Sequence, residues 1–585
     1  MSALSKIYYA STTGGGSAAC TKADPGTLDR AITLALAWIA AGNANCWIIC
    51  RGGNYYLSAP LDASTHAGIE FRNYPGETAV FSAGRLLTGS WSGPDADGVY
   101  SLSGVTGSFR DLYTGDIRAT RARSASNPAG FTISDVGITD SNSYISSLAR
   151  PQDVEMVGKN VWKFFKVRVT AAVGTAITCR AGDLARARYQ NPYNFNSVYW
   201  YENAQELVKN GQGYWYHNRS TNTLYYKPRT GENMATLEVI AGNLEQVVTH
   251  TGSLGQSAQN LIFRGIQFKH TTWLYPDTYG YTPLQAGILL AASDGSAYVK
   301  PTAAVQLYSS NAVKFYGCTF NHLGSVGVAV EYGSADTIIY NNTFTDVGGS
   351  AVMVGDVTHL TTDPWPSNPL AKISGTIIYN NLMDRVGSLW YDQCAIWCGY
   401  PNNTLIDRND ITNVPYTGIS LGWGWGYNDP PGYLSSGWPY GFVAAPVTAT
   451  SCSANTITRN KIVNWSQETY DSGAIYLNGN SPNSYCQYNY AGASGAGGGL
   501  SQAFYHDNGC SGWTTRYNVV ETPGVTRWAY LQNGFAPRAV YNTLSDNFAL
   551  NGITDTYDAS NTVANNTVGA FGVDALAIKA DAGRL

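Results

Sequence analysis

Charged residues are scarce in this chain of 585 residues, since Asp, Glu, Lys and Arg together make up only 13%. The formal net charge is −4, and the sequence has no basic stripe of the kind that nucleic-acid binding needs. No apolar run approaches the roughly 20 residues that span a bilayer. The longest one, Ala31 to Ala41, is short and indicates an ordinary helix. These absences exclude nucleic-acid binding and a membrane span.

Signatures of metal and cofactor sites are missing as well. No phosphate loop, zinc signature or nucleophilic Ser/His/Asp pattern stands out. Cys394 and Cys398 are four residues apart in a strand-like run, which is not a zinc spacing. We therefore expect no cofactor and no metal, and the ten cysteines are interpreted as buried thiols or structural disulfides of unassigned connectivity.

What is abundant is glycine (63) and tyrosine (41), with many Asn, Ser and Thr, a composition that fits an all-β protein facing carbohydrate. The length indicates one large repetitive body plus at least one further unit. No signal peptide is visible, because β-like sequence begins with Ile7-Tyr8-Tyr9. A secreted protein whose signal peptide has been removed would begin with such a strand, and so would a cytoplasmic protein. We expect a secreted or periplasmic protein, and the oligomeric state cannot be read.

An asparagine-containing motif recurs from residue 260 onward. Its spacings from Cys318 to Asn518 are 24, 39, 28, 51, 29 and 29 residues, and they are marked by Asn342, Asn381, Asn409, Asn460, Asn489 and Asn518. A coil of three short strands needs about this length, and the longer steps indicate inserted loops. Asparagine suits a tight turn, and its side chains can stack into a hydrogen-bonded ladder. The repeat predicts a parallel β-helix in preference to a β-sandwich with chance Asn-rich turns.

Two segments depart from the repeat. Leu28 to Ala41 has helical spacing of apolar residues and is ended by Gly42, so we expect a helix that caps the open end of the coil. Residues 85–237 show period-2 alternation with turn residues, which predicts an inserted antiparallel β-sandwich. The predicted division is residues 1–84 for the start of the β-helix and its cap, 85–237 for the insert, and 238–585 for the main β-helix with the active site.

The candidate catalytic residues are aspartates offered from separate coils. Asp471 begins the run Asp-Ser-Gly-Ala-Ile-Tyr, Asp392 lies in a similar run 79 residues upstream, and Asp507 follows 36 residues after Asp471. Corner residues of neighbouring coils come within several Å, which covers both glycosidase geometries, ~5–5.5 Å and ~6.5–9.5 Å. For one Asp taken alone a turn cap is the commoner role, and for two in similar sequence contexts the turn cap and the catalytic role are about equally favoured. If Ile475 points inward, Asp471 must precede a corner or bulge to face solvent.

The candidate substrate-binding residues are mostly aromatic. In a strand, Trp423 and Trp425 share one face and would form a stacking platform for a sugar ring, whereas the alternative is core packing. Glu468 is a reserve acid or base, and His506 either tunes a carboxylate or is an ordinary surface histidine. The loop 428–440 could wall a cleft. The complete set of substrate-binding candidates is Trp423, Trp425, Tyr416, Trp397, Tyr476, His506 and Glu468.

Several motifs resemble those of the right-handed parallel β-helix glycoside hydrolases with an inserted β-sandwich. The chain resembles glycoside hydrolase family 141, with its fucosidase and xylanase activities, and more distantly the family 120 β-xylosidases. The motifs are Tyr8-Tyr9-Ala10-Ser11, Gly213-Tyr214-Trp215-Tyr216, Thr223 to Pro228, Tyr416 to Gly426 and Asp471 to Tyr476. The resemblance implies a pair of catalytic carboxylates on neighbouring coils, a role that falls by position on Asp471 and Asp507.

Three functions remain open from the sequence. A glycoside hydrolase would use one Asp as acid and the other as nucleophile or base on a plant, algal or microbial glycan. A polysaccharide lyase would need an Arg or Lys base or a calcium cluster, and Lys461 is the only Lys or Arg between residues 461 and 510. A non-catalytic glycan-binding or tailspike-like protein would keep the Trp platform without needing Asp471 or Asp507.

Overall fold

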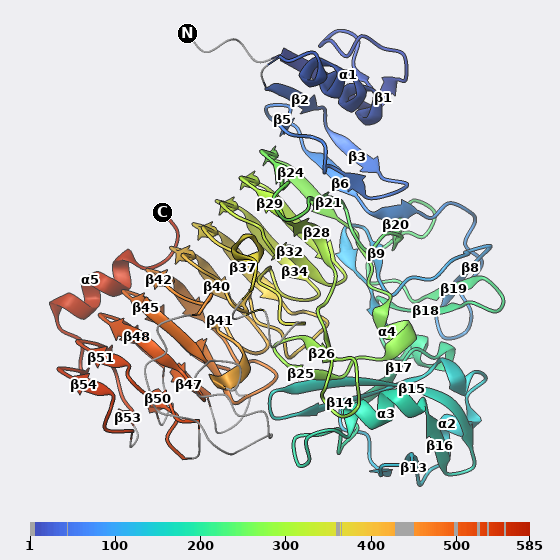
Figure 1. Ribbon diagram of the computed structural model, residues 1–585. Coiled ribbons are helices and arrows are strands. Elements are labelled where there is room, and N and C mark those ends of the chain that lie inside the picture. Colours follow the sequence, from blue (N-terminus) through green and yellow to red (C-terminus); the bar gives the residue numbers. More distant parts are fainter. Residues whose placement is uncertain are drawn as a thin grey trace.

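The computed structural model describes residues 6–43, 45–358, 363, 366–426, 450–495, 501–522, 527–534, 537–554 and 557–585. Over these residues the chain winds into a right-handed parallel β-helix, which confirms the predicted fold class (Figure 1). Its three faces are parallel sheets of 13, 11 and 12 described strands. None of the helices within these ranges is long and apolar enough to cross a membrane.

Helix α1 (Leu28–Ala40) covers the N-terminal end of the coil, at the top of Figure 1. The Thr27 hydroxyl caps it by accepting a hydrogen bond from the Arg30 N–H at 3.2 Å. Its buried face packs on β1 (Lys6–Gly15) and β2 (Cys46–Cys50), the parallel pair that starts the 13-stranded sheet. The helix thus shields the first coil from edge pairing, as the apolar spacing predicts.

The interior of the coil is filled by side chains that repeat at the same offset. Phe71, Phe263 and Phe315 stack on successive strands with ring centroids 5.2 and 5.5 Å apart. All ten cysteines lie in the described part of the chain, where each is buried and free. Of the two interpretations offered by the sequence, buried thiols is the one that the structure supports.

A buried asparagine ladder runs along one corner of the coil. In each step the side-chain amide donates to the side-chain oxygen of the next asparagine at 2.9–3.0 Å, and that oxygen also accepts a backbone N–H. This is the ladder that the recurring motif predicts. Its members are Asn342, Asn381, Asn409, Asn460, Asn489, Asn518, Asn547 and Asn566.

The 11-stranded sheet carries the residues of greatest interest. Its strands pair in parallel and in register, one strand per coil. In spatial order they are β4 (Leu61–Asp62), β21 (Val248–Thr251), β28 (Ala303–Tyr308), β32 (Val326–Glu331), β35 (Val352–Val354), β38 (Ile396–Cys398), β41 (Ile419–Leu421), β44 (Ser472–Leu477), β47 (Ser501–His506), β50 (Arg527–Leu531) and β53 (Ile553–Thr554).

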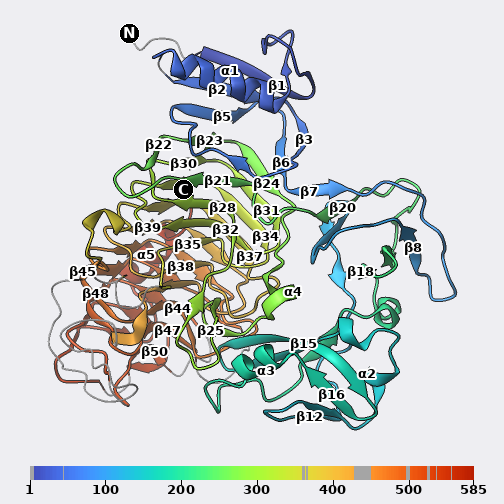
Figure 2. The same cartoon turned by 45° about the vertical axis from the view of Figure 1, so that its right-hand side comes forward.

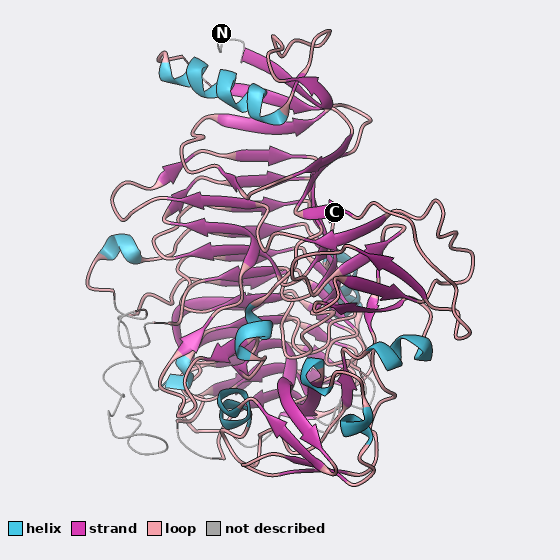
Figure 3. Ribbon diagram, turned by 90° about the vertical axis from the view of Figure 1, so that its right-hand side faces the viewer, coloured by secondary structure: helices cyan, strands magenta, loops and turns pink. Residues whose placement is uncertain are grey.

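Between β7 (Gly84–Leu86) and β20 (Val239–Gly242) the chain leaves the coil and forms small, mostly antiparallel sheets (Figures 2 and 3). The boundaries 85 and 237 stay a prediction. The largest of these sheets contains six strands, in the order β12 (Phe131–Ile133), β13 (Ile138–Asp140), β16 (Ala176–Cys179), β15 (Lys163–Val173), β14 (Glu155–Asn160) and β17 (Trp200–Glu202).

The β14–β15 hairpin joins this insert to the main coil. Lys166 and Tyr281 exchange two backbone hydrogen bonds of 2.9 Å, and the Trp162 indole donates to the Leu284 carbonyl at 2.9 Å. Tyr281 lies just before β25 (Pro283–Gln285), in a segment that packs on the coil. These contacts bring the insert alongside the 11-stranded sheet.

We expect Asn460→Ala to lower the free energy of unfolding by about 2–4 kcal/mol, because it leaves several buried donors and acceptors of the ladder without partners. Asn413→Ala is the matched control, since Asn464 donates to it across the same two coils at the exposed surface. The Asn413 hydrogen bonds are exposed, but its backbone is left-handed (φ 55°), where Ala is less favourable than Asn, so the substitution should cost about 1 kcal/mol. Urea unfolding of both variants makes the comparison, and equal midpoints would contradict a stabilising role of the ladder.

Candidate active site

Asp471 immediately precedes β44 and adopts a left-handed backbone conformation, with φ of 57°. Regular alternation would place it on the inward face with Ile475, which is buried in the core. The left-handed residue breaks that alternation and provides the corner that the sequence requires. The preceding residue is fixed from outside the coil, since the Tyr470 N–H donates to the Val161 carbonyl of the insert at 2.9 Å.

Asp507 follows the last residue of β47, one coil after Asp471. Tyr476, Tyr505 and Tyr530 occupy the same register position on β44, β47 and β50 and form a tyrosine row. Neighbouring rings of this row meet edge to face, with centroids 4.9 and 5.2 Å apart. Asp507 lies two residues beyond Tyr505, the middle member of the row.

Hydrogen bonds join both carboxylates to this row. The Tyr505 hydroxyl donates to Asp471 Oδ1 at 3.1 Å, and the Tyr476 hydroxyl donates to Asp507 Oδ2. The Trp425 indole donates to the Tyr476 hydroxyl, also at 3.1 Å. The two carboxylates therefore share one polar cluster, although they come from different coils.

Two further buried side chains, Tyr416 and Gln285, belong to the cluster. The Gln285 amide donates to the Tyr416 hydroxyl at 3.0 Å and to the Tyr476 hydroxyl at 3.1 Å. The Tyr416 hydroxyl in turn donates to the Asp471 carbonyl at 3.1 Å. Both Tyr416 and Tyr476 are buried, so they position the carboxylates rather than offer an open binding surface.

The two carboxyl groups differ in their electrostatic surroundings. Burial raises the pKa of Asp471 to about 7, the negative charge of Asp507 adds to the rise, and the Tyr505 hydrogen bond opposes it. Burial also raises the pKa of Asp507, but Tyr476, the Asn508 N–H, Tyr505 and Trp425 all favour its charged form. Asp471 is thus the carboxyl that keeps a proton near neutral pH, and Asp507 is the carboxylate that the surrounding donors stabilise.

Neither carboxylate forms an ion pair with a lysine or arginine among the described residues. Burial, followed by the charges of the nearby carboxylates, raises the pKa values of Tyr476 and Tyr505 well above 10. These tyrosines therefore remain protonated hydrogen-bond donors. Within the same residues, no group of three or more His, Cys, Asp and Glu side chains could hold a metal ion.

Asp392 does not belong to this cluster. Its side chain is fully buried, where it accepts hydrogen bonds from the Tyr281 hydroxyl at 2.5 Å and the Gly287 N–H at 3.0 Å. Burial raises its pKa to about 7, and the nearby Lys163 of the insert partly offsets the rise. A catalytic role of Asp392 stays a prediction, but the segment that holds Tyr281 and Gly287 closes over it and separates it from the expected cleft.

The predicted platform of two exposed indoles on one strand is wrong. Strand β41 ends at Leu421, and Trp425 lies in a short 3₁₀ turn, η4 (Gly424–Gly426), with a φ of 49°. Trp397 and Trp423 are buried and meet edge to face at 5.7 Å, and Trp425 packs on Trp423 at 4.8 Å. Of these three tryptophans, only the half-buried Trp425 reaches the carboxylate cluster.

His506 and Glu468 lie away from the cluster. His506 points into the coil, where it is fully buried, hydrogen-bonds Thr515 at 2.9 Å and has its pKa lowered to about 4 by burial. Glu468 forms an ion pair of 3.0 Å with Lys159 of the insert. The proposed wall 428–440 lies outside the described residues, and so does part of the Gly-rich segment 491–499.

The sequence reasoning missed Tyr505, Tyr530 and Gln285. A signal existed for Tyr505, because it follows Tyr476 by 29 residues, the spacing of the repeat in this region. Gln285 has no comparable signal, since it enters from an irregular segment more than a hundred residues upstream.

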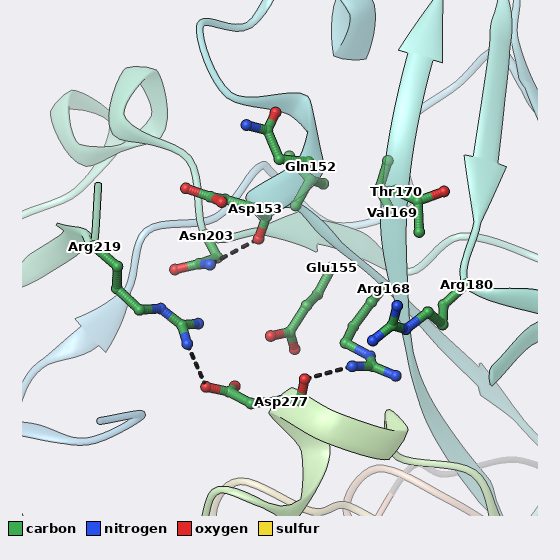
Figure 4. A pocket seen from close by; sticks show the side chains of 11 residues that line it. Gln152, Asp153, Glu155, Arg168, Val169, Thr170, Arg180, Asn203, Arg219 and Asp277 are labelled. Atoms are coloured by element: carbon green, nitrogen blue, oxygen red, sulfur yellow. Dashed lines mark hydrogen bonds and ion pairs between the residues drawn. The ribbon is translucent and has the colours of Figure 1, made fainter. Parts of the chain in front are cut away.

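A cavity of about 310 Å³ lies in the insert, separate from the carboxylate cluster, and is shown in Figure 4. Its charged groups pair with one another: Arg219 binds Asp277 at 2.9 Å, and Arg168 donates to the Asp277 carbonyl. It is lined by no aromatic side chain on which a sugar ring could stack. We therefore regard the carboxylate cluster as the better candidate.

Comparisons with known proteins agree with this architecture. The family model described as "right handed beta helix region" matches residues 287–428. No curated protein matches the sequence. A solved glycoside hydrolase is 23% identical, with a TM-score of 0.81 and coverage of 99% of both chains. XylC in complex with xylose is 12% identical, with a TM-score of 0.48 and coverage of 94% of this chain and 76% of XylC. At 23% identity, the likeness to the solved glycoside hydrolase establishes the fold alone.

We expect Asp471→Asn to stabilise the protein at pH 8 by up to about 4 kcal/mol. The folded-state pKa of about 7 lies above the unfolded value of about 3.9, so wild-type stability falls as pH rises between the two values. A neutral amide avoids this loss, and its advantage should vanish near pH 4. Thermal unfolding across pH makes the measurement, with the exposed Asp97→Asn as control. A stabilisation that is independent of pH would contradict the raised pKa.

Proposed function

We propose that the protein is a glycoside hydrolase and that Asp471 and Asp507 are its catalytic pair. The observation that carries the proposal is the cluster of two carboxylates on neighbouring coils, half-buried Asp471 and buried Asp507, joined by Tyr476 and Tyr505. Paired carboxylates of unequal pKa are what glycosidic bond cleavage requires. The solved glycoside hydrolase of similar fold adds support.

The electrostatics favour one division of roles. Asp471, with its pKa near 7, is the general acid that protonates the leaving oxygen. Asp507, held ionised by Tyr476 and its other donors, either attacks the anomeric carbon or activates water. Trp425, half-buried beside Tyr476, offers the contact surface for a sugar ring.

The sequence resemblance narrows the substrate to xylose-, fucose- or related glycosides of plant, algal or microbial glycans. It also favours a secreted or periplasmic location, where such glycans are met. A lyase is a weaker candidate, because neither carboxylate has a lysine or arginine partner in the described part of the chain and both tyrosines hold their protons.

Hydrolysis of a panel of nitrophenyl glycosides and plant or algal polysaccharides tests the function. Wild type should release sugar, and Asp507→Asn should lower kcat/KM by at least about 10³-fold. Glu468→Gln is the control, because Glu468 lies three residues from Asp471 but pairs with Lys159 at the surface. It should retain most of the activity. Products that absorb in the ultraviolet would indicate a lyase, and glycan binding without hydrolysis would indicate a binding protein.

The pH profile tests the division of roles. Activity requires Asp471 protonated and Asp507 ionised, so kcat/KM should fall as pH rises through about 7 and fall again on the acid side. In Asp471→Asn the alkaline limb should disappear. This variant should lose about 10²–10⁴-fold on glycosides with poor leaving groups and much less on nitrophenyl glycosides. An alkaline limb that survives the substitution would assign the acid to another residue.

A further inference from the structure

A cavity of about 210 Å³ lies where the insert meets the main coil. On the insert side, it is lined by residues of β10 (Ile117–Arg118), β11 (Thr120–Arg121), β15 and β17. On the coil side, it is lined by the segment Ser388–Tyr391, which follows β37 (Leu382–Val386). The cavity of Figure 4 differs from it in being confined to the insert and α4 (Tyr275–Tyr279).

Positive charge exceeds negative charge in this lining. Five cationic side chains face three carboxylates: Arg110, Arg118, Arg121, Arg123 and Lys166 against Asp111, Glu202 and Asp346. Burial makes each charge interact more strongly than it would at the surface. Glu155 and Asp277, which pair with Arg110 and Arg121 from outside the lining, bring the carboxylates to five. An anion in the cavity must therefore be recognised by a cation that has no ion pair of its own.

Four of the five cations are engaged by protein carboxylates. Arg110, Arg118 and Arg121 each contact two, and Lys166 contacts Glu202 at 2.9 Å. Arg123 differs, because within the described residues it forms no ion pair. Its guanidinium lies 4.5 Å from the Trp200 ring and beside the Tyr391 hydroxyl. Arg123 and Tyr391 are both half-buried, and so they are the polar groups that a ligand can reach.

The aromatic rings of the cavity are already covered. The Lys166 ammonium lies 4.8 Å from the centre of Trp390, and Tyr281 stacks on the same indole at 4.5 Å. Trp200 is covered by Arg123 and contacts Phe164. No broad ring face is left for a sugar to stack on, so recognition here depends on charge and hydrogen bonds.

The cavity adjoins the catalytic pair. The Tyr391 carbonyl accepts a hydrogen bond of 2.9 Å from the hydroxyl of Thr469, which is two residues before Asp471. Glu468, one residue earlier, is close enough for its charge to add to the rise in the Tyr391 pKa. A glycan chain held at Asp471 thus has this cavity beside it.

We propose that this cavity binds the anionic group of an acidic glycan, a uronate carboxylate or a sulfate ester, with Arg123 as its principal partner. A guanidinium presents a planar fork of donors that matches either anion, and Tyr391 supplies a further hydroxyl donor. The inference deepens the proposed function, on which it rests for the glycan being a substrate, and it names an acidic glycan as the substrate class.

Binding measured without cleavage tests the cavity separately from the catalytic pair. Asp507→Asn protein is titrated with oligogalacturonides and their carboxyl-reduced forms, and with sulfated galactan oligosaccharides and their desulfated forms. At least one acidic probe should bind tenfold or more tightly than its neutral form, and the preference should weaken with salt. The acidic member that shows the preference identifies a carboxylate or a sulfate as the ligand.

Adding Arg123→Gln should abolish the preference for the acidic form, and Arg123→Lys should restore part of it. Arg180→Gln is the matched control, because Arg180 lines the other cavity of the insert and should leave the preference intact. Equal binding of acidic and neutral forms in both pairs, or a preference that survives Arg123→Gln, would overturn the proposal. If wild type prefers the acidic form but hydrolyses no glycan, the anion site is supported and the glycosidase is rejected. If wild type hydrolyses glycans without such a preference, the glycosidase is supported and the anion site is rejected.

Discussion

In-register stacking of the coils is the constraint on which the rest of the molecule depends. Parallel pairing places residues of equal offset about 4.8 Å apart on successive coils. This arrangement turns Tyr476, Tyr505 and Tyr530 into a continuous row and places Asp507 beside Tyr505, its middle member. A slip of one residue would exchange the two faces of a strand, and the buried asparagine ladder opposes it because its amides meet their acceptors only when the coils are in register. The rigid scaffold therefore fixes the site.

Asp471 departs from this regularity in two ways that both cost stability. A left-handed conformation is unfavourable for a non-glycine residue by about 1–2 kcal/mol, and its carboxyl lies where burial disfavours the charged form. Tyr505, Tyr416 and the Tyr470 contact with the insert hold it there. Unfavourable features that coincide at one residue are typical of a position kept for chemistry.

The sequence predicts the parts of this structure that follow a period. The asparagine steps predict the β-helix and its ladder, the apolar spacing predicts α1, and the coil spacing relates Asp471 to Asp507. Failures occur where contacts are long-range or where a strand ends early. Trp425 was placed by alternation, but the chain turns after Leu421. Asp392 has a similar local context, yet Tyr281 closes over it from a distant segment, and no local pattern reports such a contact.

The insert contributes a cluster of buried charged residues at its boundary with the coil. Buried ion pairs such as Arg110–Glu155 and Arg121–Glu202 lose hydration on burial, so packed apolar side chains could dock two surfaces at least as firmly. Stability alone therefore gives no reason for so dense a cluster of charges at this boundary. Arg123 lies at its accessible edge and forms no ion pair among the described residues, and the β14–β15 hairpin that joins insert to coil also holds Tyr470. One structural unit thus both orients Asp471 and presents a cation near it, and on this ground we propose the insert as part of the recognition surface.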